Sequence, residues 1–359
     1  MLNGAFSGIH IAQRAPMPAW KNTLLRLLAV VLALLIGALF IACLGLNPLK
    51  VYETMITGAI EKKTARVNVI KNAIPLAIVA LGVTLAFRMK FWNIGAEGQI
   101  CVGAIAASFF AYNFEWPAWL MITVMALAGF VAGGIYGLIP AYFKTKYGTN
   151  ETLFTLMMNY IAAFFIQFLR EGPWRDPSKM GFPEMPRFGK YARLPEVLDV
   201  HAGWVFAIAI ALFVLIYLRY TKQGYELTVV GDNITTARYA GMPVNRIIWR
   251  TMFLSAGICG LSGMVQASGA DKMLTDTVAG GDGFTAIIIA WLARLSPVGI
   301  LLIAVLFGVL EKGCATVETV HKLSGEFADI LQGIILFCVL GAEFFITYQI
   351  KRNRKEVKG

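Results

Sequence analysis

The fold class is decided by residues 117–143, whose sequence PAWLMITVMALAGFVAGGIYGLIPAYF contains no charged side chain. Residues 27–49 and 251–270 are two further uncharged apolar runs. A helix needs about 20 such residues to cross the hydrocarbon core of a membrane, whereas the strands of a membrane barrel are about 9–11 residues long and alternate in polarity. We therefore expect an all-α, polytopic integral membrane protein.

Apolar blocks recur along the whole chain, and several are shorter than a full membrane span. Ten blocks lie near residues 27–49, 72–87, 98–114, 117–143, 152–169, 202–218, 251–270, 283–293, 295–310 and 330–350. We expect about ten transmembrane helices, some short or broken, in a transmembrane domain over residues 27–350. Only Arg294 separates the eighth block from the ninth, so two short helices and one broken helix are both open.

The charge and composition favour a membrane environment over a nucleic-acid partner. The chain is 58% hydrophobic and 15% charged, with a formal net charge of +11, and so few charges do not cover the surface of a soluble domain. Cationic loops beside anionic cytoplasmic lipid account for the positive charge. We place the segment 1–26, the segment 219–250 and the basic tail 351–359 in the cytoplasm, and expect a multi-pass protein of the bacterial cytoplasmic (inner) membrane.

Motifs for catalysis and for metal binding are missing from the sequence. The five cysteines are isolated and there are three histidines, and no spacing suits a zinc site or a disulfide framework. The chain has no G-x-x-x-x-G-K-[ST], G-x-S-x-G or H-E-x-x-H sequence, which are signatures of nucleotide binding, serine hydrolysis and metalloproteolysis. We predict no catalytic site, cofactor or metal in this chain.

The segment 170–203 interrupts the apolar pattern. It contains five prolines and mixed charge, and a proline inside a helix removes a hydrogen bond and clashes with the preceding turn. The segment is therefore not helical throughout. Two interpretations stay open: a connecting loop, or a docking surface for a partner outside the cytoplasm.

A polar motif lies between the second and third apolar blocks. Residues 93–99 read NIGAEGQ, and two glycines in four residues discourage a continuous helix. Broken helices around a polar stretch often line a transport pathway, and an ionisable residue at membrane depth is a functional candidate. Asn93, Glu97 and Gln99 are therefore pathway candidates. The alternative is an interfacial turn in which Glu97 is solvated beside a nearby cation.

Two further candidate positions lie next to apolar blocks. Asn159 would lie about two turns into the fifth block, where a buried amide either joins neighbouring helices or faces a polar cavity. Residues 279–284, AGGDGF, come just before the eighth block. They form either a plain turn or an external gate, with Asp282 and Phe284 as the candidate residues.

The fourth block carries a regular glycine pattern. Gly129, Gly133 and Gly137 are spaced by four residues. Small residues at this spacing let the backbones of membrane helices approach closely. We predict a packing face rather than a functional site.

The segment 219–250 contains a short helix with its own start and stop signals. Asp232 or Asn233 can cap its first turn, and Gly241 followed by Pro243 ends it. A helix of two turns is unstable alone in water, so it packs either on the spans of this chain or on a motor subunit. The candidate contact residues are Asn233, Ala237, Arg238, Tyr239, Ala240 and Gly241.

Six stretches, taken in order, resemble one protein family. They are residues 75–99, 150–160, 172–177, 237–241, 255–263 and 281–297. They resemble the permease subunits of ABC importers for nucleosides and simple sugars, within the wider branched-chain amino acid, ribose and xylose permease family, and the resemblance covers roughly residues 57–345. The motif at 93–99 points to the nucleoside branch, and the sequence departs from the family at Trp92 and at residues 291–294.

The resemblance implies a pathway for a nucleoside or simple sugar in a transporter of several subunits. Two permeases, the second identical or paralogous, would join two ABC ATPase subunits, and the ATPase would bind ATP and Mg²⁺. A substrate-binding protein or lipoprotein would deliver the solute from outside, and membrane lipid would surround the spans. The short helix within 219–250 would couple ATP hydrolysis to transport. An ion-driven secondary transporter is the alternative, with Glu97 and Glu343 as the carboxylates that offer themselves for a coupling ion.

Overall fold

Helices make up nearly all of the regular structure of this chain. The computed structural model describes residues 9–13, 18–181, 183–322, 326, 327, 330, 331, 333–335, 337, 338, 341, 342 and 348–352. The chain divides into two compact units, a larger one of residues 59–312 and a smaller one drawn from residues 1–58 and 313–359. The candidate pathway and coupling residues lie in the larger unit, and Glu343 lies outside the described residues.

The smaller unit is built on a bent pair of helices. Its elements are α1 (Ala19–Cys43), α2 (Pro48–Ile60) and the strands β1 (Ile9–Gln13) and β4 (Tyr348–Arg352). The axes of α1 and α2 differ by 113°, and the Tyr52 hydroxyl donates a hydrogen bond to the Leu34 carbonyl oxygen across the bend at 2.7 Å. The strands β1 and β4 pair antiparallel.

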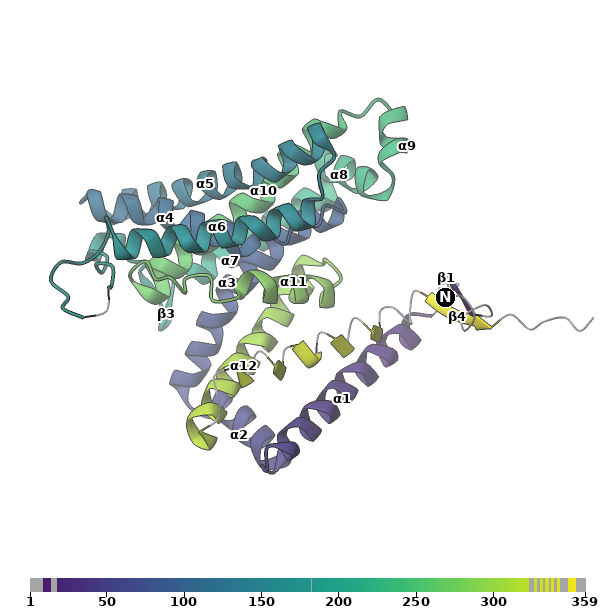
Figure 1. Cartoon of the computed structure of the whole chain (residues 1–359), viewed down its shortest axis with the longest axis horizontal. Coiled ribbons are helices and arrows are strands. Elements are labelled where there is room, and N and C mark those ends of the chain that lie inside the picture. The colour runs from purple at the N-terminus through teal and green to yellow at the C-terminus, as the bar shows by residue number, and fades with distance from the viewer. Residues whose placement is uncertain are drawn as a thin grey trace, which may run out of the picture. The chain divides into compact units, whose positions relative to one another are not determined.

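The larger unit is a helical bundle in which a long connection joins α6 to α7 (Figure 1). Its elements are α3 (Lys63–Arg88), α4 (Ala96–Asn113), α5 (Ala118–Tyr147), α6 (Glu151–Glu171), η1 (Lys190–Ala192), β2 (Glu196–Val197), β3 (Val200–His201), α7 (Gly203–Tyr220), α8 (Lys222–Asp232), α9 (Ile234–Tyr239), α10 (Val244–Val265), the π-helix η2 (Gln266–Asp271), α11 (Asp282–Leu292) and the first part of α12 (Pro297–His321). Asn150 caps α6 and Thr221 caps α8, because their side-chain oxygens accept the amide hydrogens of Leu153 and Gly224.

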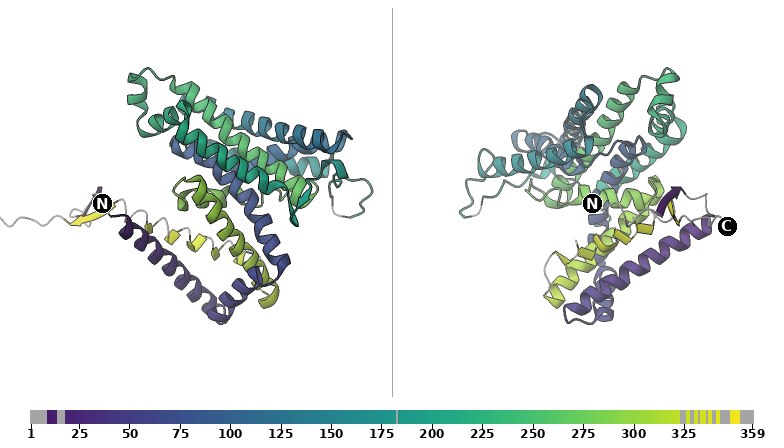
Figure 2. Two further views of the ribbon diagram at one scale, coloured as in Figure 1. Left: turned by 180° about the vertical axis from the view of Figure 1, so that it is seen from behind. Right: turned by 45° about the vertical axis from the view of Figure 1, so that its right-hand side comes forward.

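Helix α10 lies at the centre of the larger unit and packs on α3, α4 and α5 (Figures 1 and 2). The contact is close enough for backbones to touch. A Cβ atom on Gly103 would lie 2.1 Å from the carbonyl oxygen of Gly260, and one on Gly133 would lie 2.6 Å from that of Ala256. Gly129 likewise faces Gly260. This glycine seam confirms the packing face predicted in the fourth apolar block.

The segment between α6 and α7 folds onto the ends of α4 and α10. The Phe188 amide donates to the Lys272 carbonyl oxygen at 2.9 Å, and the Leu194 amide donates to that of Ser268 at 3.1 Å. Tyr112 of α4 packs edge-on against Phe188. The segment contains η1 and the pair β2–β3 and is not helical throughout, which confirms the prediction from its prolines.

Six described helices are long and apolar enough to cross a membrane, or seven if α1 and α2 form one bent span. This confirms a multi-pass helical membrane protein, but the expected count of about ten is not confirmed. The blocks near 98–114 and 283–293 form α4 and α11, which are shorter or less apolar, and the block near 330–350 lies partly outside the described residues. Arg294 and Leu295, both at a φ of 55°, separate α11 from α12, so the eighth and ninth blocks form two helices.

The glycine seam makes a direct prediction. Gly103→Ala should lower the free energy of unfolding by about 1–3 kcal/mol, the usual cost of overpacking a core, although alanine favours a helix more than glycine does. The measurement is the thermal midpoint of the purified protein in detergent. Gly189→Ala is the control, because a Cβ atom there meets nothing within 4 Å. Equal midpoints for Gly103→Ala and the wild type would contradict the seam.

Candidate functional site

The polar motif at 93–99 forms the break between α3 and α4. Asn93 and Gln99 are buried and exchange hydrogen bonds: the Asn93 amide nitrogen donates to Gln99 at 3.2 Å, and the Gln99 amide nitrogen donates to Asn93 at 3.1 Å. The Asn93 side-chain oxygen also accepts the Gly95 amide hydrogen at 3.1 Å. The two side chains therefore hold the turn from which α4 starts.

Two side chains of helix α6 form hydrogen bonds with the backbone of the same turn. The Asn159 side-chain oxygen accepts from the Gly98 amide at 2.9 Å, and its nitrogen donates to the Ile94 carbonyl oxygen at 2.9 Å. The Thr155 hydroxyl accepts from the Ile94 amide at 3.2 Å. Asn159 is 5% exposed, so its amide joins two elements, as the helix-joining interpretation expects.

Glu97 connects the motif to a second glycine-rich stretch. Its two carboxylate oxygens accept hydrogen bonds from the backbone amides of Gly281 and Gly283, each at 2.8 Å. These amides belong to the first turn of α11, where a negative charge also interacts favourably with the helix dipole. A Cβ atom on Gly283 would lie 2.4 Å from the Glu97 amide nitrogen, so only glycine fits there. We call this contact the carboxylate lock.

Asp282 and Phe284 flank the carboxylate lock but differ in their surroundings. Asp282 begins α11 and lines a cavity of about 190 Å³. Phe284 does not line this cavity, and its side chain is 43% exposed. The cavity has six polar lining residues, which are Lys71, Asn72, Gln266, Thr277, Asp282 and Glu311.

Sequence reasoning found only Asp282 among these six residues. Lys71 and Asn72 lie at the edge of an apolar block, and Gln266 lies near the end of another. The available signal was a polar side chain at membrane depth. The sequence pattern did not single out these three residues, because none of them belongs to a glycine-rich break. Sequence reasoning also did not pair Gly281 and Gly283 with Glu97.

The short helix predicted within 219–250 is present as α9 (Figure 1). Asn233 caps it and accepts from the amides of Thr235 and Thr236 at 2.9 and 3.1 Å. Ala237 is buried against this chain, whereas Arg238, Ala240 and Gly241 are exposed and Tyr239 is 90% exposed. The helix thus packs on its own chain through one residue and presents the others outward.

Helix α8 brings this region into contact with α3. A Cβ atom on Gly231 would lie 2.1 Å from the carbonyl oxygen of Arg88, the last residue of α3. Arg88 precedes Asn93 by five residues. The α8–α9 segment and the polar break are therefore joined through the end of one helix.

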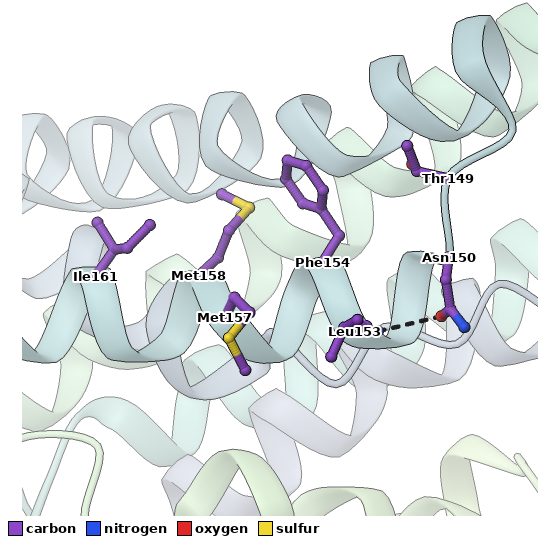
Figure 3. A pocket seen from close by; sticks show the side chains of 7 residues that line it. All are labelled: Thr149, Asn150, Leu153, Phe154, Met157, Met158 and Ile161. Carbon is purple, nitrogen blue, oxygen red and sulfur yellow. Dashed lines mark hydrogen bonds between the residues drawn. The ribbon is translucent and has the colours of Figure 1, made fainter.

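A second hollow lies beside α6 and has a different character (Figure 3). It measures about 410 Å³, and its lining residues are Thr149, Asn150, Leu153, Phe154, Met157, Met158 and Ile161. The Asn150 side chain is occupied as the helix cap, as the dashed bond to Leu153 shows. Most of the lining is apolar, so this hollow suits a hydrocarbon chain rather than a polar solute.

The carboxylate lock predicts a graded response at Glu97. Glu97→Ala should lower the free energy of unfolding by about 3 kcal/mol or more, because a hydrogen bond to a charged group contributes about 1.5–3 kcal/mol and two are lost. Glu97→Gln keeps one acceptor oxygen and should lose about half as much. Thermal unfolding in detergent measures both. Glu115→Gln is the matched control, since Glu115 is exposed, and a Glu97→Ala midpoint equal to this control would refute the lock.

Comparisons with known proteins identify the family of this chain. The family model for the branched-chain amino acid transport system permease component matches residues 65–340. A glucose ABC transporter permease of Haloferax volcanii is 30% identical and the match covers 95% of this chain and 93% of the relative. A guanosine ABC transporter permease of Bacillus subtilis is 29% identical, with 94% and 98% covered. A nucleoside ABC transporter permease of Lactococcus lactis is 28% identical, with 93% and 94% covered.

These relatives are transport permeases rather than enzymes, which confirms the prediction of an ABC permease over an ion-driven transporter. The family match covers most of the chain, including the polar break, the α8–α9 segment and the start of α11. The chain therefore belongs to the permease-component family of branched-chain amino acid transport systems.

Proposed function

We propose that this permease forms the translocation pathway for a nucleoside or a simple sugar in an ATP-driven importer. The relatives named for glucose, guanosine and nucleosides support this class of solute. The observation that carries the proposal is the carboxylate lock, which joins two helix starts at a polar break between apolar helices. Transport pathways in membranes are often built from interrupted helices of this kind.

The α8–α9 segment is the proposed docking site of the ATPase. Its exposed residues Arg238 and Tyr239 are available to a partner, while Asn233 and Ala237 hold the helix in place. Movement of α8 would reach the end of α3 through Gly231, and from there the polar break, the carboxylate lock and α11. ATP and Mg²⁺ would be bound by the ATPase and not by this chain.

The charge distribution supports a cytoplasmic position for α8–α9. Lys144 and Lys146 lie in the last turn of α5, and Arg219 lies in the last turn of α7, directly before α8. Cytoplasmic ends of membrane helices are enriched in such residues. In the proposed orientation, both termini would lie in the cytoplasm of a bacterial cell.

The opposite face would carry the segment between α6 and α7. This segment would face the substrate-binding protein or lipoprotein, and a second permease, identical or paralogous, would complete the membrane part. The helices α4 and α11 would add to the membrane segments, and the predicted block near 330–350 lies partly outside the described residues.

The direct test is purification of the complex from native membranes in mild detergent. A tag on this chain should recover an ATPase subunit bearing a Walker A sequence, which mass spectrometry identifies together with any second permease. Recovery of the chain alone across several detergents would count against an ABC transporter. Uptake driven by an imposed proton or sodium gradient would then be measured.

If the ATPase docks on α9, a substitution on the exposed side of α9 should reduce the amount of ATPase that is recovered with this chain. Tyr239→Asp should reduce the recovered ATPase about tenfold or more, because interface truncations at exposed aromatic anchors often cost more than about 1–2 kcal/mol. Tyr191→Asp is the matched control, since Tyr191 is 55% exposed and lies in η1. Quantitative mass spectrometry compares the two samples, and equal ATPase recovery would exclude α9 as the docking site.

A further inference from the structure

The cavity beside Asp282 is assembled from five separate elements of the larger unit. Lys71 and Asn72 come from α3, Gln266 from η2, Thr277 from the connection to α11, Asp282 from α11 and Glu311 from α12. The η2 segment is a π-helix, a rare form that occurs frequently at functional sites. Five elements converging on one polar space indicate a built site rather than a packing defect.

The surrounding bonds orient the polar wall of this cavity. The Gln266 side-chain nitrogen donates to an Asp271 carboxylate oxygen at 3.2 Å, and the Thr275 hydroxyl donates to the other oxygen at 3.3 Å. Gln266 therefore keeps its side-chain oxygen as an acceptor. Pro75 also lines the cavity and has no amide hydrogen, so the Lys71 carbonyl oxygen lacks its usual partner within α3.

The chemistry of the wall suits a neutral molecule rich in hydroxyl groups. Lys71 is a donor, Asp282 and Glu311 are acceptors when ionised, and the amide and hydroxyl side chains supply both functions. A sugar hydroxyl donates and accepts at once, so it can bind both kinds of group. Two formal negative charges against one positive charge disfavour a phosphate group.

The size of the cavity limits what part of a solute it can hold. A volume of about 190 Å³ corresponds to roughly six water molecules in the liquid, and sites for larger organic ligands measure about 300–1,000 Å³. No lining residue is aromatic, so the wall offers no stacking surface for a nucleobase. A single sugar ring matches both the volume and the chemistry.

We propose that this cavity binds the sugar ring of the transported solute, unphosphorylated and through its hydroxyl groups. The proposal rests on the proposed function, and it identifies the sugar as the part recognised by the permease. The proposed solutes, simple sugars and nucleosides, share such a ring. The carboxylate lock positions Asp282 at the wall, because Glu97 holds the amides on both sides of it.

Protection of an introduced thiol tests the proposal directly. Thr277→Cys is prepared in the assembled transporter in lipid nanodiscs, and its rate of reaction with a small maleimide is measured. The parent transporter gives the background, since Cys43 is exposed and Cys101, Cys259, Cys314 and Cys338 are buried. Ribose, glucose, inosine, hypoxanthine and ribose 5-phosphate are added separately at millimolar concentration, and ATP-driven uptake of inosine and glucose is measured in proteoliposomes.

Ribose, glucose or inosine, added at about four times its Kd, should slow maleimide labelling of the introduced thiol roughly fivefold. Hypoxanthine and ribose 5-phosphate should leave the rate unchanged. Labelling that no sugar slows while uptake proceeds would overturn the cavity proposal and leave the proposed function intact. Equal protection by hypoxanthine would also overturn it. Absence of uptake for both solutes would contradict the proposed function, and the protection result would still decide the cavity.

Two substitutions in the wall provide a second measurement. Asp282→Asn and Asn72→Ala should each lower the uptake rate about tenfold, the effect of losing one hydrogen bond to a charged or well-oriented partner. Glu115→Gln and Asn113→Ala are the matched controls, because Asn113 is exposed at the end of α4 and Glu115 is exposed in the turn that follows. Uptake by the wall variants equal to that of the controls would contradict the proposal. If the Asp282→Asn transporter fails to assemble, uptake by the Asn72→Ala variant and the thiol protection test the proposal.

Discussion

The Glu97 carboxylate satisfies two backbone amides at the start of α11, and the arrangement of the site depends on this contact. Helix α11 has no side-chain cap of its own, and an unpaired amide away from water costs free energy. Glu97 itself lies in the first turn of α4. One side chain therefore sets where two short helices begin, and the amides it holds flank Asp282.

The polar groups around this contact are mostly engaged with the backbone. Asn93, Gln99 and Asn159 each bond to another side chain or to the turn at 93–99. A polar break inside an apolar bundle is stable only when such groups have partners. The cavity beside Asp282 is bordered by the polar side chains of six residues.

The fold class, the capped helix α9 and the glycine packing face could all be predicted from the sequence. Each depends on residues that are close together in the chain: uncharged runs, an Asn cap before a glycine stop, and glycines spaced by four. The contact between Glu97 and Gly283 joins residues 186 positions apart. No local sequence pattern predicts this contact, because the carboxylate binds backbone amides rather than a complementary side chain.

The number of membrane segments was harder to predict for a related physical reason. Helices α4 and α11 begin at polar or glycine-rich turns inside the bundle, so their lengths are set by tertiary contacts instead of by membrane thickness. The cavity residues Lys71 and Gln266 were missed because three-dimensional convergence, and not spacing in the sequence, brings them together.

The glycine seam has a consequence for motion during transport. Where backbone touches backbone, as between Gly103, Gly133 and α10, no side chain is available to change rotamer and absorb a displacement. Packed elements of this kind shift as rigid bodies, and larger changes concentrate at joints between them. Helices α4, α5 and α10 would then act as a fixed frame. One such joint is the glycine pair before α11, where Gly280 and Gly281 both adopt positive φ, and the bond from the Gly281 amide to Glu97 would have to break before this joint could turn.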